Sequence, residues 1–200
     1  MSGKRTLPPW LWTAAVLAAD FLTKRLVLAH AADLQPHREV IGDLARLTYV
    51  RNAGAAMGIF DGGRGLLIAV SALTSLFLVF LYARSGPAQR GRRAALAAIL
   101  GGALGNLVDR VFYGGRVVDF IDLGFGPHRF YTFNVADMGV TLGGAALFLI
   151  LVAESRAEAR REAARREAAD GEDEAGPADG IVTGPAAGAA DAPDAGPSAP

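Results

Sequence analysis

Four apolar stretches dominate this chain, and each is long enough to cross a lipid bilayer. They cover approximately residues 10–29, 66–82, 94–112 and 135–153. A bilayer core of roughly 30 Å requires about 20 apolar residues in helical form. Because lipid offers the backbone no hydrogen-bond partners, stretches of this kind must be helical. The sequence therefore predicts an all-α membrane protein with four transmembrane helices.

The first stretch also has features of a cleaved secretion signal, with Lys4 and Arg5 ahead of it and small residues behind it. Asp20 and Lys24 lie inside its apolar region, however, which a signal sequence tolerates poorly. We therefore interpret residues 10–29 as a permanent span. Asp20 and Lys24 are four positions apart and share one helix face, so we expect a structural ion pair more than direct chemistry. Loss of Asp20 should then leave Lys24 unpaired.

Arginines set the expected orientation of the spans. The short connection 84–93 holds four arginines, and the far longer connection 30–65 holds only four as well. Since basic residues concentrate in short cytoplasmic loops, we expect both termini inside and the connections 30–65 and 113–134 outside. The β-branched and aromatic residues of 38–54 predict short strands and a turn, and hence a small folded cap.

Charge divides the chain near residue 153. Residues 1–153 carry 15 Lys and Arg against 9 Asp and Glu, whereas residues 154–200 carry 5 against 11. The basic excess lies beside apolar runs, so it indicates membrane topology and no nucleic-acid partner. We predict a membrane domain, 1–153, and a cytoplasmic tail, 154–200, that begins as a helix and is disordered from about residue 171.

Several chemistries lack the residues they need. The chain has no cysteine, which excludes disulfides, thiolate metal sites and cysteine nucleophiles. Its histidines, His30, His37 and His128, show no metal-ligand spacing, and the sequence has neither a GxSxG turn nor a phosphate-binding loop. We therefore expect no metal and no cofactor.

Three acids remain as candidates for chemistry: Asp109, Asp119 and Asp137. If the third span runs outward and the fourth inward, all three fall at the same outer level. A carboxylate inside a bilayer costs about 2.5–3.5 kcal/mol, so an acid kept there suggests a functional site, although an acid at a helix end in water is the plain alternative. Neighbouring carboxylates share a proton, so one can take a proton from water while the other gives one to a leaving group. A carrier that binds protons or cations with these acids is the rival function.

Polar residues and glycines surround these acids at helical spacing. Asn106, Asp109 and Arg110 share one helix face, and so do Asn134 and Asp137. We expect Arg110 to be the partner of Asp109. The small-xxx-small pairs Gly101/Gly105 and Gly139/Gly143 predict close contacts between helices.

Five blocks of sequence, taken in order, resemble the lipoprotein signal peptidases (signal peptidase II) of bacteria. The blocks are "DFLTK" at 20–24, "RNAGAAMGIF" at 51–60, "GGALGNLVDR" at 101–110, "VVDFIDL" at 117–123 and "FNVADMGVTLG" at 133–143. Together they span roughly residues 10–153, and five blocks in the family's order are far more specific than any one of them.

The resemblance implies a four-helix intramembrane aspartyl protease with a small extracytoplasmic β-cradle between the first two helices. It would lie in the bacterial cell membrane, surrounded by lipid, with its active site near the outer face. Its substrates would be diacylglyceryl-modified prolipoproteins, cut just before the lipidated cysteine. Neither the resemblance nor the sequence indicates the oligomeric state, the native substrates, the role of the tail or which acid is the base.

The resemblance also carries residue roles onto this chain. The catalytic dyad would be Asp119 and Asp137. Met57 stands where the family usually has Phe. The supporting positions would be Asp20, Lys24, Asn52, Gly54, Asn106, Asp109, Arg110, Asn134 and Ala136.

Overall fold

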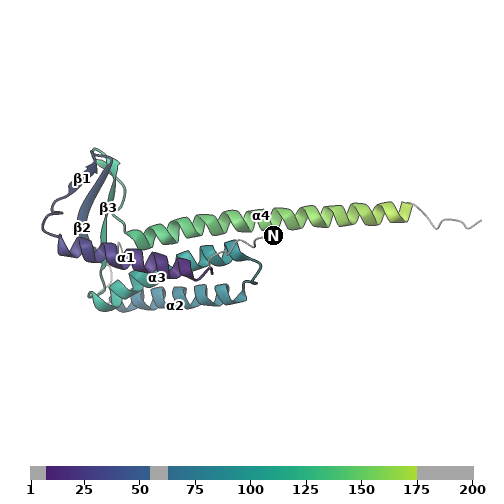
Figure 1. The fold of residues 1–200 in the computed structure, drawn as a ribbon, viewed down its shortest axis with the longest axis horizontal. Coiled ribbons are helices and arrows are strands. Elements are labelled where there is room, and N and C mark those ends of the chain that lie inside the picture. Colours follow the sequence, from purple (N-terminus) through teal and green to yellow (C-terminus); the bar gives the residue numbers. More distant parts are fainter. Residues whose placement is uncertain (1–7, 55–62, 175–200) are drawn as a thin grey trace, which may run out of the picture. The chain divides into compact units, whose positions relative to one another are not determined.

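The structure is a computed structural model, and it describes residues 8–54 and 63–174. Four helices account for most of them (Figure 1): α1 (Leu11–Ala29), α2 (Gly63–Arg84), α3 (Arg90–Phe112) and α4 (Val135–Glu174). Residues up to Arg156 form one compact unit and the later residues a second one. Within the first unit α3 packs against both α1 and α2.

Three of the described helices are long and apolar enough to cross a membrane: α2, α3 and the part of α4 from Val135 to Ala168. The 19-residue helix α1 does not join them, because it contains Asp20, Lys24 and Arg25. Asp20 and Lys24 are nevertheless only 1% and 4% exposed. The charged groups of Asp20 and Lys24 are therefore buried inside the helical bundle.

Helix α4 continues beyond the predicted end of the fourth span at residue 153. Its later part is rich in Ala, Glu and Arg, which favour helices, and Arg166 pairs with Glu162 one turn earlier. The helix ends at Glu174. Disorder was predicted from about residue 171, so the helix continues slightly further than expected. Residues 175–200 lie outside those described, and their disorder stays a prediction.

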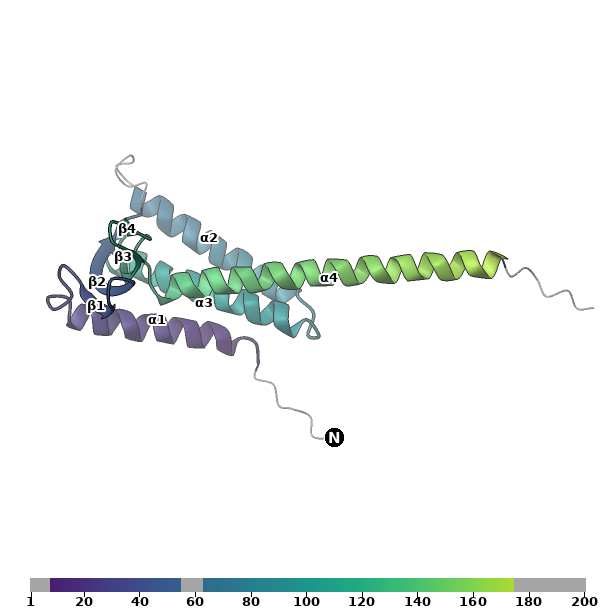
Figure 2. The same ribbon diagram turned by 90° about the horizontal axis from the view of Figure 1, so that it is seen from above.

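A four-stranded antiparallel sheet lies at one end of the helices (Figure 2), in the order β1 (Arg38–Ile41), β2 (Ala45–Asn52), β3 (Val117–Phe125) and β4 (His128–Arg129). The predicted helical fold with a small β-cradle is confirmed in its main features, but the cradle does not come from the connection between the first two helices alone. Strands β3 and β4 come from the connection between α3 and α4. A two-stranded hairpin is marginal by itself, and pairing with β3 extends it to a stable sheet.

Glycines let α3 approach two helices at once. A Cβ on Gly101 would lie 2.8 Å from the Thr13 carbonyl oxygen of α1, and a Cβ on Gly102 would overlap the Ala136 carbonyl oxygen of α4. Real Cβ atoms do not make contacts this short, so only glycine allows both approaches. Gly101 belongs to the predicted small-xxx-small pair, whereas the tighter contact at Gly102 was not predicted.

We expect Gly102→Ala to lower the free energy of unfolding by about 1–3 kcal/mol, because the added methyl meets backbone that cannot rotate away. Gly144→Ala is the matched control: Gly144 lies on α4 with no packed neighbour within 4 Å of its Cβ position. Because Ala favours a helix by up to about 1 kcal/mol over Gly, this variant should be as stable as the unmodified protein or slightly more stable. Thermal unfolding in detergent measures both. Equal stability of the two variants would contradict the close packing of α3 against α4.

Candidate active site

Strand β3 fixes the position of Asp119. Its neighbours Val118 and Phe120 are buried in an apolar cluster with Val27 and Leu34. Successive side chains of a strand point to opposite faces, so Asp119 points away from this cluster. The side chain is almost fully enclosed, with 2% of the residue exposed.

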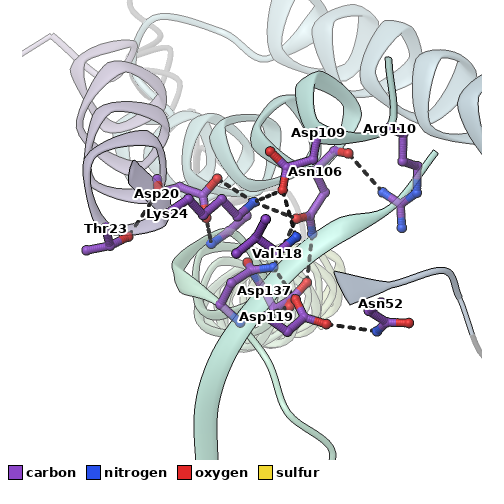
Figure 3. Close-up of polar contacts among 12 residues, drawn as sticks. Asp20, Thr23, Lys24, Asn52, Asn106, Asp109, Arg110, Val118, Asp119 and Asp137 are labelled. Atoms are coloured by element: carbon purple, nitrogen blue, oxygen red, sulfur yellow. Dashed lines mark hydrogen bonds and ion pairs between the residues drawn. The ribbon is translucent and has the colours of Figure 1, made fainter. Parts of the chain in front are cut away.

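Two amides hold the Asp119 carboxylate. Asn52 Nδ2 donates to Asp119 Oδ2 at 2.8 Å (Figure 3), and Asn134 Nδ2 donates to Asp119 Oδ1 at 2.7 Å. The Asn52 amide is oriented by the Gly54 N–H, which donates to Asn52 Oδ1 at 2.8 Å. Gly54 has a φ of +86°, a conformation that favours glycine.

Asp137 lies in the first turn of α4 and helps to begin that helix. Asn134 Oδ1 accepts the Asp137 N–H at 3.0 Å, and Asp137 Oδ2 accepts the Asn134 N–H at 3.2 Å. This reciprocal pattern is a capping box. The other oxygen, Asp137 Oδ1, accepts from Asn106 Nδ2 at 2.8 Å. Asp137 is thus a helix-end acid, but only half of its carboxylate is used in the cap.

Asn134 joins the two acids, because its amide binds Asp119 while its backbone N–H binds Asp137. Burial raises the pKa of Asp119 to about 6, against the lowering effect of the hydrogen bonds from Asn52 and Asn134, and the nearby Asp137 charge adds to the increase. A carboxyl group with this pKa can hold a proton near neutral pH and still release it.

Lys24 is the centre of a second polar cluster, which is joined to Asp137 through Asn106. Its Nζ is 2.8 Å from Asp20 Oδ2 and 3.0 Å from Asp109 Oδ2, and it donates to Asn106 Oδ1 at 3.1 Å. The ion pair predicted between Asp20 and Lys24 is therefore present, with Asp109 as an unpredicted third member. All three charged residues are buried, so each depends on the others for its stability.

Backbone donors complete this cluster. The Ala136 N–H donates to Asp20 Oδ1 at 2.9 Å, and the Val118 N–H donates to Asp109 Oδ2 at 3.0 Å. A Cβ on Gly105 would lie 2.6 Å from Asp20 Oδ2, so Gly105 makes room for the carboxylate. The cluster thereby connects α1, α3, β3 and the start of α4.

The expected pairing of Asp109 with Arg110 is wrong. Asp109 faces Lys24, whereas Arg110 Nη1 donates to the Asn106 carbonyl oxygen at 3.2 Å. Adjacent residues of a helix point about 100° apart, so one of them faces α1 while the other faces elsewhere. Only the positions of α1 and α3 together reveal the partner of Asp109.

An apolar recess of about 300 Å³ adjoins Asp137. Its walls are mostly hydrocarbon, and a single hydroxyl comes from α4. The lining residues are Phe130, Phe133, Asp137, Met138, Thr141 and Leu142. One of the two acids is therefore reachable from an apolar surface.

Comparison with known proteins gives the family. A sequence model described as signal peptidase (SPase) II matches residues 12–153. The match includes every element that contributes to the two polar clusters. The chain belongs to the signal peptidase II family.

Curated relatives agree with this assignment. The lipoprotein signal peptidase of Brevibacillus brevis is 39% identical over 140 residues, covering 70% of this chain and 91% of the relative. That of Psychromonas ingrahamii is 38% identical over 143 residues, covering 69% and 81%. Two solved structures, both bacterial membrane enzymes obtained by the in meso method, have TM-scores of 0.64 at 30% and 31% identity, covering 74% and 72% of this chain and 88% and 91% of theirs.

The structure brings together the residues that the resemblance to signal peptidase II assigned to the site. Asn52, Asn106 and Asn134 contact the two acids directly. Gly54 and Ala136 act through backbone N–H groups. Met57 lies outside the described residues.

One contributor was missed. The Val118 N–H binds Asp109, and no sequence signal could have identified it, because every residue except proline carries a backbone N–H. In the part of the chain that the structure describes, no three His, Asp or Glu side chains are placed to hold a metal ion.

Proposed function

We propose that the chain cleaves diacylglyceryl-modified prolipoproteins just before the lipidated cysteine, with Asp119 and Asp137 as its catalytic dyad. Membership of the signal peptidase II family makes it an aspartic-type hydrolase that removes signal peptides from prolipoproteins. The carrier alternative has no support among these relatives. The roles of the two acids are our proposal.

One observation carries the dyad proposal: a single residue, Asn134, binds both carboxylates. Acids bound to the same residue are close enough to influence each other, which agrees with the effect of Asp137 on the pKa of Asp119. Two carboxyl groups in this arrangement favour one shared proton. Such a pair can activate water with one member and protonate the substrate with the other.

The apolar recess beside Asp137 fits a substrate that is anchored in lipid. A diacylglyceryl group holds the adjoining peptide bond at the membrane surface, where the bond must meet two acids and a water molecule. We propose that the dyad lies near the outer face of the bacterial cell membrane. Four spans, with α1 included and both termini cytoplasmic, complete the proposed topology.

A direct assay tests the function. The purified protein in detergent micelles is incubated with a prolipoprotein that carries the diacylglyceryl group, and the products are identified by gel shift and mass. We expect cleavage immediately before the modified cysteine. The same prolipoprotein without its diacylglyceryl group should not be cleaved. A pH-driven cation flux in vesicles, without cleavage of the lipidated substrate, would replace the peptidase by the carrier.

The topology has its own test. Because the chain has no cysteine, a single cysteine at Ala88, between α2 and α3, reports on one position only. We expect this cysteine to be protected from an impermeant thiol reagent in intact cells and labelled after the membrane is opened. Labelling in intact cells would place the connection outside and reverse the proposed orientation.

A further inference from the structure

The directions of the hydrogen bonds around the dyad are fixed by groups that can only donate. Lys24 is an ammonium group with no acceptor, so the Asn106 atom facing it at 3.1 Å must be the oxygen. The Asn106 amide nitrogen is then the atom that faces Asp137 Oδ1, at 2.8 Å. Lys24 therefore orients Asn106 as a donor to Asp137.

The other two amides are anchored in the same way. The Asp137 N–H requires an acceptor, which fixes Asn134 Oδ1 and turns the Asn134 NH₂ toward Asp119 and Asn106 Oδ1. The Gly54 N–H fixes Asn52 Oδ1 and turns the Asn52 NH₂ toward Asp119. Each of the four carboxylate oxygens of the dyad thus accepts one N–H, and each acid accepts two.

The two acids still differ in three ways. Asp137 lies in the first turn of α4, where the positive end of the helix dipole favours an anion, whereas Asp119 lies on a strand. The amide that donates to Asp137 is polarised by the buried Lys24 cation. Asp119 is 2% exposed, while Asp137 is half-buried. All three differences favour the negative charge on Asp137.

We propose that Asp137 is the general base of the reaction, that Asp119 carries the proton in the resting enzyme, and that Lys24 and Asn106 are positioning residues that enforce this division. This inference rests on the proposed function. The charged side chains that contact the hydrogen-bond network around the dyad are Asp20 and Lys24 of α1 and Asp109 and Arg110 of α3. Of these four, only Lys24 donates to the side-chain amide of a residue that binds the dyad, namely Asn106.

With these roles, each acid ends the reaction in the protonation state in which it began. The oxygen of a water molecule bonds to the scissile carbonyl carbon and passes a proton to Asp137, while Asp119 gives its proton to the carbonyl oxygen. The C–N bond then breaks as Asp137 passes its proton to the leaving nitrogen and Asp119 recovers a proton from a hydroxyl of the intermediate. The products are a carboxyl group and an amine, and the dyad returns to its starting state. Burial raises the pKa of Asp119 to about 6, which is the direction that the role of proton carrier requires.

The pH dependence of kcat/KM tests the assignment, because a base and an acid limit opposite sides of a bell-shaped profile. An N–H donor favours the charged form of a carboxyl group, so removing that donor raises the group's pKa. Asn106→Ala removes a donor from Asp137 and should move the acid limb to higher pH. Asn52→Ala removes a donor from Asp119 and should move the alkaline limb to higher pH. Each shift should be about one pH unit.

The reverse pattern, or a profile that neither variant moves, would overturn the assignment. Asn52 is exposed at the end of β2, so we expect Asn52→Ala to fold. If Asn106→Ala does not fold, the shift of the alkaline limb in Asn52→Ala decides the assignment. Asn106→Ser then gives a second measurement of the acid limb. Asp119→Asn and Asp137→Asn are assayed at every pH beside them. If either stays active, the dyad proposal itself fails. If both are inactive and the limbs respond in reverse, only the assignment of base and acid fails.

Discussion

Replacing Asp119 or Asp137 by Asn is expected to lower kcat by at least about 10³-fold, because an amide keeps the shape of the carboxyl group but cannot exchange a proton. Stability should fall only modestly. Each acid accepts two N–H groups, so one of them would face the new NH₂ group, at a cost of about 1–3 kcal/mol. Cleavage of one lipidated substrate and thermal unfolding of the purified variants measure the two effects separately.

The control is Asp122→Asn. Asp122 lies three residues after Asp119 on the same strand, but its carboxylate binds Arg129, so cleavage should remain near that of the unmodified protein. The double variant Asp119→Asn/Asp137→Asn should be no worse than either single one, since each already disables the unit. Substantial turnover by Asp119→Asn, together with a stable and inactive Asp109→Asn, would move the dyad to Asp109 and Asp137.

Removal of Lys24 should have the largest effect on stability. Lys24→Met leaves the buried carboxylates of Asp20 and Asp109 without their cation and leaves Asn106 Oδ1 with one donor fewer. Loss of one partner from a buried ion pair costs about 3–5 kcal/mol. We expect an unfolding free energy lower by about this amount, seen as a reduced melting temperature in detergent.

Two comparisons make this result specific. Arg25→Met changes the next residue of α1, whose exposed side chain lies over the rings of Phe21 and Tyr113, and should cost little. Asp20→Asn should also cost less than Lys24→Met, because Lys24 retains Asp109. The double change Lys24→Met/Asp20→Asn should recover part of the loss. If Lys24→Met is as stable as Arg25→Met, the buried cluster does not hold the helices together.

The earlier expectation for Asp20 therefore needs correction. From the sequence, Asp20 and Lys24 formed a pair by themselves, so loss of Asp20 was expected to leave the lysine uncompensated. The structure gives Lys24 a second carboxylate, Asp109, from α3. Helical spacing identifies partners on one helix, but it carries no information on which face of a second helix is opposite.

The sequence was most informative about features that depend on residues close together in the chain. The apolar runs predicted the helices, because lipid restricts a spanning backbone to that form. The spacing of Asp20 and Lys24 predicted their contact, and that of Asn134 and Asp137 predicted a shared face. The five family blocks identified the polar residues that the structure brings together.

Long-range contacts could not be predicted in the same way. The pairing of Val50 with Asp119 joins positions far apart in the chain, and residues 113–134 gave no signal that they would extend the sheet formed by 38–52. Gly102 was missed because the small-xxx-small pattern selects Gly101 and Gly105. A Cβ on Gly101 would meet α1, whereas a Cβ on Gly102 would meet α4.

The start of α4 supplies several contacts on which the earlier elements depend: the Ala136 N–H for Asp20, the Asn134 amide for Asp119 and the Asp137 carboxylate for Asn106. A ribosome makes these residues after α1, α2, α3 and β3. Until then, the nascent chain lacks Asp137, and it lacks Asn134, whose amide binds Asp119. If Asp119 and Asp137 are the dyad, as we propose, hydrolytic activity can arise only late in translation, once the start of the fourth helix has been made, and we expect a chain that ends before residue 134 to be inactive.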